Sequence, residues 1–370
     1  MAASPAWPVP LGHAEWLQGL WNAARSGRLP HGLLLSGAMG VGKFTAARWL
    51  ALGLLCDQGP GEPCLQCGPC HRAQAGTHPD LFEVDARAHG LDALGVAFFA
   101  PRRETRSSGY TGPSVAEFLS LRSAEGGARV VLVREAERMN LSAQNAFLKT
   151  LEEPAAGTIL VMESSQPGVL LPTILSRVVV VPVPAPSLEQ ATEVLAGLQA
   201  AQAKGKSKVR PWEPDALAEL VRMAQGSPGL AWRYGLQERL AMRGVLVGVL
   251  AGTMGAVEAR RRLMELPGTF EGKTPTAEAR ERAACVLDLA LQLLQDTERA
   301  LAGVPLDALA HGAYLDESMA QPVSFRRAAT QRLLDVRADV ALNLGAESLL
   351  DRALLALTPA PIPAFKGHAS

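Results

Sequence analysis

The stretch LLLSGAMGVGKF, residues 33–44, joins a short apolar run to a glycine-rich loop that ends in a lysine. The loop fits the pattern G-x-x-x-x-G-K, in which backbone N–H groups surround phosphates and the lysine adds a positive charge. We expect a strand before the loop and a helix after it. The candidate nucleotide-binding residues are Gly37, Gly40, Gly42 and Lys43.

Further short apolar runs alternate with helical patterns through the first half of the chain, which predicts an α/β fold with a parallel sheet. The expected strands are 33–35, 81–84, 130–133, 158–162 and 178–183. One intervening helix follows Gly42, with Phe44, Ala47, Ala51 and Leu54 spaced along one face.

A second helix is predicted for NLSAQNAFLKTLEEP, residues 140–154. Asn140 is placed to cap its start and Pro154 to end it. Its apolar face is expected to carry Leu141, Leu148 and Leu151. Residues 86–113 are rich in Gly, Arg and Ser with little periodicity, so we expect a long loop there.

Prolines at 182, 184 and 186 mark a boundary after the last expected strand. Beyond it the patterns are helical, at 188–198, 215–224, 230–242, 276–301 and 347–357. The end, TPAPIPAFKGHAS, is expected to be a disordered tail.

Composition limits the classes of protein. The 370 residues are 48% hydrophobic, with 36 basic and 36 acidic residues, so a wholly basic nucleic-acid coat is disfavoured. No run reaches about 18 apolar residues, and the start lacks the pattern of a signal peptide. We therefore expect a cytoplasmic protein that makes no membrane contact.

The phosphate loop is degenerate. A Ser or Thr hydroxyl after the lysine normally holds Mg²⁺, but Phe44 occupies that position and Thr45 lies about 100° further around the helix. The strand at 130–133 is followed by Arg134 and Glu135, so an arginine stands where the metal-binding Asp of a Walker B motif belongs. These losses disfavour Mg²⁺ binding and hydrolysis and leave ATP binding open. Glu135 matches an activating glutamate; alternatively, Glu135 and Glu137 begin a solvated helix face.

Four of the five cysteines give the spacing C-x7-C-x2-C-x2-C. Four thiolates form a closed tetrahedral zinc site, which favours a structural ion over a catalytic one. The two tight x2 spacings favour a metal over free thiols, and zinc is favoured over an iron–sulfur cluster because no Pro-flanked fourth cysteine follows Cys70. The predicted ligands are Cys56, Cys64, Cys67 and Cys70. His71 and His78 are interpreted as spectators and Cys285 as a core residue.

The combination of PHGLLLSGAMGVGK, the four-cysteine insert, GTHPDLFEVD, NLSAQNAFLKTLEEP and LPTILSRV resembles the delta-prime family of bacterial DNA polymerase III clamp-loader subunits. The match covers residues 10 to 182 well, and the rest matches mainly in layout. The family belongs to the AAA+ proteins, together with the gamma/tau and replication factor C subunits.

The resemblance implies an AAA+ domain at 1–183 with a zinc insert at about 56–70, a helical lid at 184–245, a helical collar at 246–358 and a tail at 359–370. It also implies a subunit that does not hydrolyse ATP itself. Its expected partners are gamma/tau and delta subunits in a hetero-pentameric ring, the sliding clamp and primed DNA. The enzymatic activity would be that of the DNA polymerase holoenzyme in a nucleoid-associated replisome.

Within the motif Ser176-Arg177-Val178, the resemblance makes Arg177 an arginine finger for ATP on a neighbouring subunit. A guanidinium stays charged and stabilises charge that develops on the γ-phosphate. On the residue alone, a surface salt bridge is favoured.

Weaker correspondences concern other positions. Ser164 or Ser165 matches the sensor-1 residue, and Gly229 replaces a sensor-2 arginine. The basic loop 204–210 either contacts DNA phosphates or is simply solvated. Its cationic residues are Lys204, Lys206, Lys208 and Arg210.

Two alternatives remain open at the level of sequence. One is an active AAA+ ATPase that resembles gamma/tau. The other is a zinc-dependent DNA-binding protein.

Overall fold

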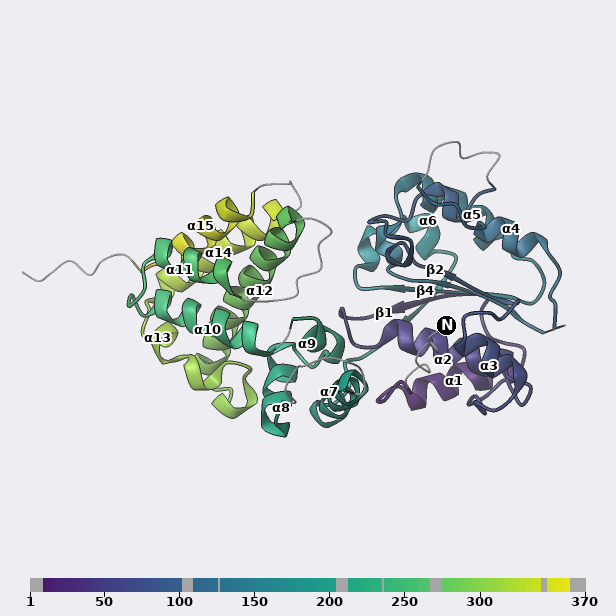
Figure 1. Cartoon of the computed structure of the whole chain (residues 1–370), viewed down its shortest axis with the longest axis horizontal. Coiled ribbons are helices and arrows are strands. Elements are labelled where there is room, and N and C mark those ends of the chain that lie inside the picture. The colour runs from purple at the N-terminus through teal and green to yellow at the C-terminus, as the bar shows by residue number, and fades with distance from the viewer. Residues whose placement is uncertain are drawn as a thin grey trace, which may run out of the picture. The chain divides into compact units, whose positions relative to one another are not determined.

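A computed structural model of the protein describes residues 9–101, 109–125, 127–203, 212–234, 236–266, 275–340 and 345–359. These residues form two compact units (Figure 1). Unit 1 runs up to Val194 and also contains Gly226–Gly229. Unit 2 contains Leu195–Gln225 and the residues from Leu230 onward.

Unit 1 is built on a five-stranded parallel sheet with the order β2-β3-β4-β1-β5. The strands are β1 (Gly32–Ser36), β2 (Leu81–Val84), β3 (Arg129–Val133), β4 (Thr158–Ser164) and β5 (Val179–Pro182). All five expected strands are therefore present and the predicted parallel α/β fold is confirmed.

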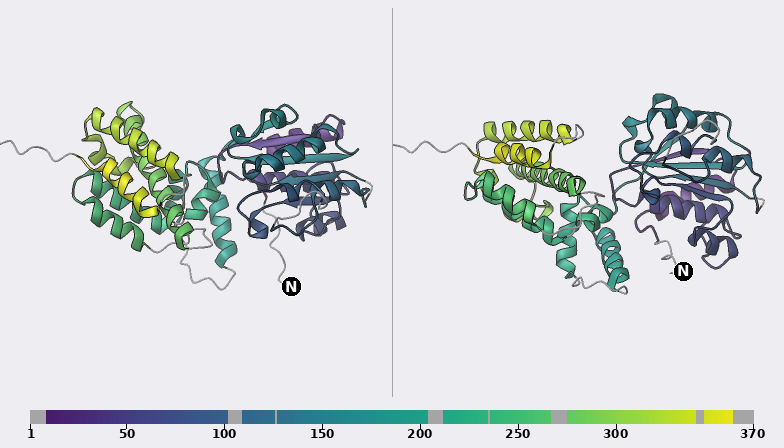
Figure 2. Two further views of the ribbon diagram at one scale, coloured as in Figure 1. Left: turned by 90° about the horizontal axis from the view of Figure 1, so that it is seen from above. Right: turned by 45° about the horizontal axis from the view of Figure 1, so that its top comes forward.

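The central strands are buried on both faces, which explains their continuous apolar runs. Successive side chains alternate between two cores: Leu34 faces one core, whereas Leu33 and Leu35 face the other. Helices cover both faces of the sheet (Figures 1 and 2). The helices of this unit are α1 (Ala14–Arg25), α2 (Lys43–Leu55), α3 (Gly68–Gln74), α4 (Val115–Ser120), α5 (Leu141–Glu152) and α6 (Pro172–Leu175), and α7 (Leu188–Ala203) starts in it.

Helix α5 begins as predicted, because the Asn140 side chain accepts a hydrogen bond from the backbone N–H of Ala143. The predicted apolar face is partly wrong: Leu141 is 62% exposed. The buried face instead contains Ala143, Phe147 and Leu151, at four-residue spacing. Leu141 lies about 200° around the axis from Ala143 and so points away from the core.

The expected loop at 86–113 is more ordered than predicted where it is described. It contains 3₁₀ helices at Arg87–His89 and Val96–Phe98. Phe98 and Phe99 are buried, and the ring of Tyr110 stacks on Phe98 with 3.8 Å between centroids. Aromatic burial thus gives structure to a segment without periodicity.

Unit 2 is helical in its described part. Its helices are α8 (Pro214–Met223), α9 (Pro228–Tyr234, which begins in unit 1), α10 (Leu236–Leu250), α11 (Ala256–Glu265), α12 (Pro275–Leu301), α13 (Asp316–Met319), α14 (Val323–Asp339) and α15 (Ala346–Leu357). One large apolar core contains residues of α8, α10, α11, α12, α14 and α15. Cys285 is 1% exposed in this core, as expected.

The predicted lid–collar boundary after residue 245 falls inside α10, and the division into three domains stays a prediction. Of the tail predicted at 359–370, residues 360–370 lie outside the described residues. Among the described helices, none is both long and apolar enough to cross a membrane.

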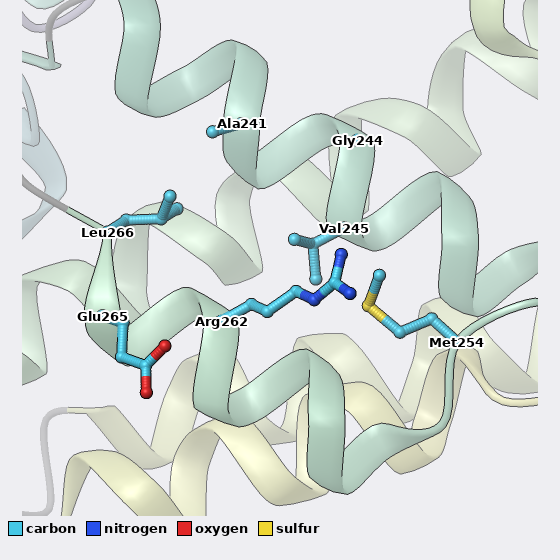
Figure 3. Close-up of a pocket in the computed structure, with 7 residues that line it drawn as sticks. All are labelled: Ala241, Gly244, Val245, Met254, Arg262, Glu265 and Leu266. Carbon is cyan, nitrogen blue, oxygen red and sulfur yellow. The ribbon is translucent and has the colours of Figure 1, made fainter.

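A pocket of about 470 Å³ lies between α10 and α11 in unit 2 (Figure 3). Ala241, Val245 and Leu266 line it, and the Arg262 side chain extends toward Met254. Arg262 donates to Glu258 at 2.7 Å, so its charge is already paired on its own helix.

The cap of α5 provides a test of the fold. We expect Asn140→Ala to lower the free energy of unfolding by about 1 kcal/mol, since the N–H of Ala143 loses its partner. The exposed Ser142→Ala, two residues on, is the matched control and should change stability by less than about 0.5 kcal/mol. Denaturant unfolding of both variants measures the difference, and equal stabilities would contradict the capping role.

Candidate functional site

The glycine-rich loop lies between the end of β1 and the start of α2, at the carboxyl edge of the parallel sheet. Gly42 has φ of 99°, a left-handed conformation that favours glycine, and α2 begins at the next residue. The imidazole Nε2 of buried His13 lies 2.9 Å from the carbonyl oxygen of Val41. Burial lowers the pKa of His13, so the ring supports the loop as a neutral hydrogen-bonding group.

Lys43 is buried, and other residues of the same chain contact its ammonium group. The Nζ atom donates to the carbonyl oxygen of Ala38 at 2.9 Å and lies 3.5 Å from Oε2 of Glu163. The two charged side chains are only 4% and 7% exposed. Burial raises the pKa of Glu163, and the nearby positive charge of Lys43 opposes that rise.

Phe44, at the position of the missing hydroxyl, has the guanidinium groups of two arginines near its ring. The guanidinium carbons of Arg48 and Arg134 are 4.7 Å and 5.2 Å from the centre of its ring. Arg134 also pairs with Asp85 at 3.0 Å. An arginine paired with Asp85 therefore occupies the place where a Walker B carboxylate would hold Mg²⁺.

Glu135 is held by arginines rather than left ready to activate water. Its carboxylate accepts a hydrogen bond from Arg87 at 2.9 Å and another from Arg138. The neighbouring Glu137 accepts from the Ser165 hydroxyl at 2.6 Å. Burial acts to raise the pKa of Glu137, but hydrogen bonds from Ser165 and Ser164 lower it overall. Both glutamates are therefore engaged with side chains of the same chain, Glu135 with two arginines and Glu137 with Ser165.

The segment Gly226–Gly229, which we call the 226–229 segment, contacts the loop within unit 1. The Ser227 hydroxyl donates a hydrogen bond to the carbonyl oxygen of Met39 at 2.7 Å. The backbone N–H of Gly229 donates to the carbonyl oxygen of Gly40 at 2.9 Å. A Cβ atom at Gly229 would lie 2.8 Å from the Gly40 oxygen. An arginine at this predicted sensor-2 position would therefore collide with the loop.

Sequence reasoning missed Glu163 and Asp85. Both follow or end apolar strands, and an acidic residue at the end of a buried strand is the signal that marks them. Glu163 also accepts a hydrogen bond from the backbone N–H of Glu135 at 2.9 Å. It thereby joins the ends of β3 and β4 to the loop lysine.

The four predicted zinc ligands come together between the end of α2 and the start of α3. Their sulfurs lie within 4.8 Å of one another, and those of Cys56 and Cys67 are 3.9 Å apart. Zn–S bonds of about 2.3 Å in a tetrahedron place sulfurs about 3.8 Å apart, so the cluster fits a zinc ion. His78 instead contacts Asp80 and Glu125, which agrees with its interpretation as a spectator.

The cysteines differ in their local environment. Backbone N–H groups of Gln66 and Cys67 lower the pKa of Cys64 to about 7. Burial raises the pKa of Cys56 and Cys70. A bound cation would stabilise all four as thiolates and hold the ends of α2 and α3 together.

Arg177 follows α6 and precedes the edge strand β5, so it is distant from the phosphate loop along the sequence. Its side chain is partly exposed. Its guanidinium contacts Glu152 at 2.6 Å and donates to the carbonyl oxygen of Thr173 at 2.8 Å. The predicted basic loop 204–210 lies outside the described residues.

A parallel sheet with a phosphate loop after β1, combined with a helical C-terminal part, is the architecture predicted for an AAA+-type protein. Residues 12–187 match the family described as "DNA polymerase III, delta subunit". The chain is 36% identical over 233 residues to DNA polymerase III subunit delta' of Pseudomonas aeruginosa, covering 61% of this chain and 63% of that protein. These findings confirm the resemblance to the delta-prime family over the α/β unit.

Other comparisons give more distant similarities. DNA polymerase III subunit tau of Salmonella typhimurium is 32% identical over 223 residues, which cover 59% of this chain and 30% of that protein. The solved structure of a gamma subunit-related protein from Thermotoga maritima aligns with a TM-score of 0.41 at 17% identity, covering 91% of this chain and 98% of that one. The chain thus spans less than two thirds of the length of the curated relatives named here.

We expect the isolated chain to show no Mg²⁺-dependent ATP hydrolysis. Phe44→Thr should not restore it, because Arg134 still repels the metal next to the new hydroxyl. Steady-state phosphate release measures both proteins. Turnover by the wild-type chain that disappears in Lys43→Ala would contradict this prediction.

Elemental analysis should find about one zinc ion per chain. Cys67→Ser should lose the metal and lower Tm, because three thiolates remain where four are needed. Cys285→Ala is the matched control: it removes a buried thiol in unit 2 and should keep the full metal content. Metal-free wild-type protein purified without chelator would count against the zinc site.

Proposed function

We propose that this chain acts as a delta-prime-type subunit of a DNA polymerase III clamp loader. In this role it hydrolyses no ATP and supplies Arg177 to ATP bound by a neighbouring subunit. The observation that carries the proposal is the combination of a phosphate loop without metal-binding groups and a partly exposed arginine in the Ser-Arg-Val motif. Support comes from the family match and from relatives named delta'.

The surroundings of Arg177 fit a residue that acts on another molecule. Its side chain is 34% exposed and that of its partner Glu152 is 48% exposed. Val179 and Val180 follow on β5, an edge strand of the sheet, and are 48% and 47% exposed. Exposed apolar side chains on a strand edge are typical of an interface.

The Arg177–Glu152 pair is weak enough to be exchanged. Exposed ion pairs contribute about 0–1 kcal/mol, because water competes for both charges. A γ-phosphate that approaches the guanidinium offers a stronger, charge-assisted set of hydrogen bonds. Glu152 thus pairs with Arg177 at the surface, and the arginine loses little free energy when it leaves this partner for a γ-phosphate.

The proposed partners are gamma/tau and delta subunits in a pentameric ring, which together place a sliding clamp on primed DNA. Polymerase activity would belong to the holoenzyme. The alternative is an active ATPase that resembles gamma/tau, and the similarity to a tau subunit is its support. Phe44, Arg134 and Gly229 argue against it, since each replaces a group that hydrolysis uses.

We expect Arg177→Ala to assemble normally with gamma/tau and delta subunits and to reduce ATP hydrolysis at the adjoining site by about 10³-fold or more. The reason is the loss of the guanidinium that stabilises charge on the γ-phosphate. Total ATPase activity of the reconstituted complex, with DNA and clamp, measures the effect. Turnover at other sites should persist.

Arg25→Ala is the matched control, because it removes an exposed arginine that bonds only within its own helix among the described contacts. It should leave the activity of the complex unchanged. Equal activity of complexes with Arg177→Ala and wild-type chains would reject the arginine-finger role. Failure of the wild-type chain to assemble with these subunits would reject the proposed function itself.

A further inference from the structure

An acidic side chain of the same protein lies beside the lysine of the phosphate loop, where a phosphate ligand would otherwise bind. Glu163 lies at the end of β4, next to β1, and its Oε2 is 3.5 Å from Nζ of Lys43. Both residues are at least nine-tenths buried, at 5% and 6% exposure. A buried lysine needs an anionic partner, and here the chain supplies it.

Glu163 is held firmly in this position. Its Oε1 accepts the backbone N–H of Glu135 at 2.9 Å, while Oε2 faces the lysine. The remaining described contact of Nζ is the carbonyl oxygen of Ala38, within the loop itself. The positive charge of the lysine is thus paired within the chain, without any ligand.

The other side of the loop is also fixed by groups of this chain. Ser227 and Gly229 donate hydrogen bonds to the carbonyl oxygens of Met39 and Gly40. These bonds pin the loop backbone from the 226–229 segment. In an active site, the bound nucleotide holds the loop in its closed form. Here side-chain and backbone groups of the same unit hold the loop instead.

We propose that Glu163 replaces the phosphates of a nucleotide as the anionic ligand of Lys43, so that the loop is closed to polyphosphates and keeps its shape without them. Removing the Glu163 charge leaves Lys43 unpaired and creates a polyphosphate site. Binding at this site requires no Mg²⁺, because Phe44 and Arg134 exclude the metal. The inference does not depend on the proposed clamp-loader role.

The test is Glu163→Gln in the full-length isolated chain, with ATP and inorganic pyrophosphate as probes in EDTA. Isothermal titration should show binding about tenfold or more tighter than for the wild-type chain. Asp296→Asn is the matched control, since it removes the charge of a carboxylate that is 5% exposed in unit 2. It should bind no better than wild type.

The two probes separate the sources of binding. Similar affinity for pyrophosphate and ATP assigns the site to phosphate alone, as the proposal expects. Binding of ATP but not pyrophosphate would place the nucleotide elsewhere and overturn the proposal. Wild-type chain that binds either probe as tightly as Glu163→Gln would also overturn it.

Folding of the variant can be checked by a second pair of measurements. If Glu163→Gln is unstable, pyrophosphate should raise its Tm, and absence of any rise overturns the proposal. The double variant Lys43→Met, Glu163→Gln removes both charges together, which is tolerated better than a lone buried charge. It should fold and bind neither probe, whereas retained binding would show that Lys43 is not the ligand.

Discussion

The parallel pairing of β1 with β4 is the constraint on which the site depends. Leu35 lies opposite Glu163 and Ser36 opposite Ser164, so the glutamate ends beside the start of the phosphate loop. A one-residue slip would move Glu163 to the opposite face of the sheet, into the core that contains Leu160 and Met162. The same slip would leave Lys43 buried without an anion. Register, loop geometry and the ion pair of the lysine are therefore set together.

Features formed by neighbouring residues were predictable from the sequence. The strands were found because both faces of the central strands are buried and their apolar runs are continuous. The cap at Asn140 and the four-cysteine cluster also lie within short segments, and the structure places them as expected. What escaped prediction depends on residues far apart along the chain: Glu163 meets Lys43, and Arg134 meets Asp85, only once the strands are paired. The prediction that Leu141 is buried was wrong for a related reason. Residue spacing shows which side chains share a helix face but not which face packs against the core.

The three departures from an active ATPase act on the same small volume. Arg134 supplies positive charge where Mg²⁺ would sit, and Phe44 fills the adjacent position with a ring that the arginine covers. Gly229 allows the 226–229 segment to approach the loop, where any larger residue would collide with Gly40. In the proposed non-hydrolysing subunit, a loop that binds no Mg²⁺ has no use for a sensor arginine. Restoring one of the three groups alone would therefore leave the other two departures in place.

Two ion pairs of this unit differ in solvent exposure, and this difference sets how easily each pair can be separated. Lys43 and Glu163 are buried, and separating them would leave an uncompensated charge in a medium of low dielectric constant, which costs several kcal/mol. Arg177 and Glu152 are exposed, and their separation costs about 1 kcal/mol or less. The first pair is consequently costly to separate, whereas the second can yield to a competing anion. A chain with this division has a fixed phosphate loop and an arginine that is free to act on a neighbouring molecule, which is the arrangement that the proposed function requires.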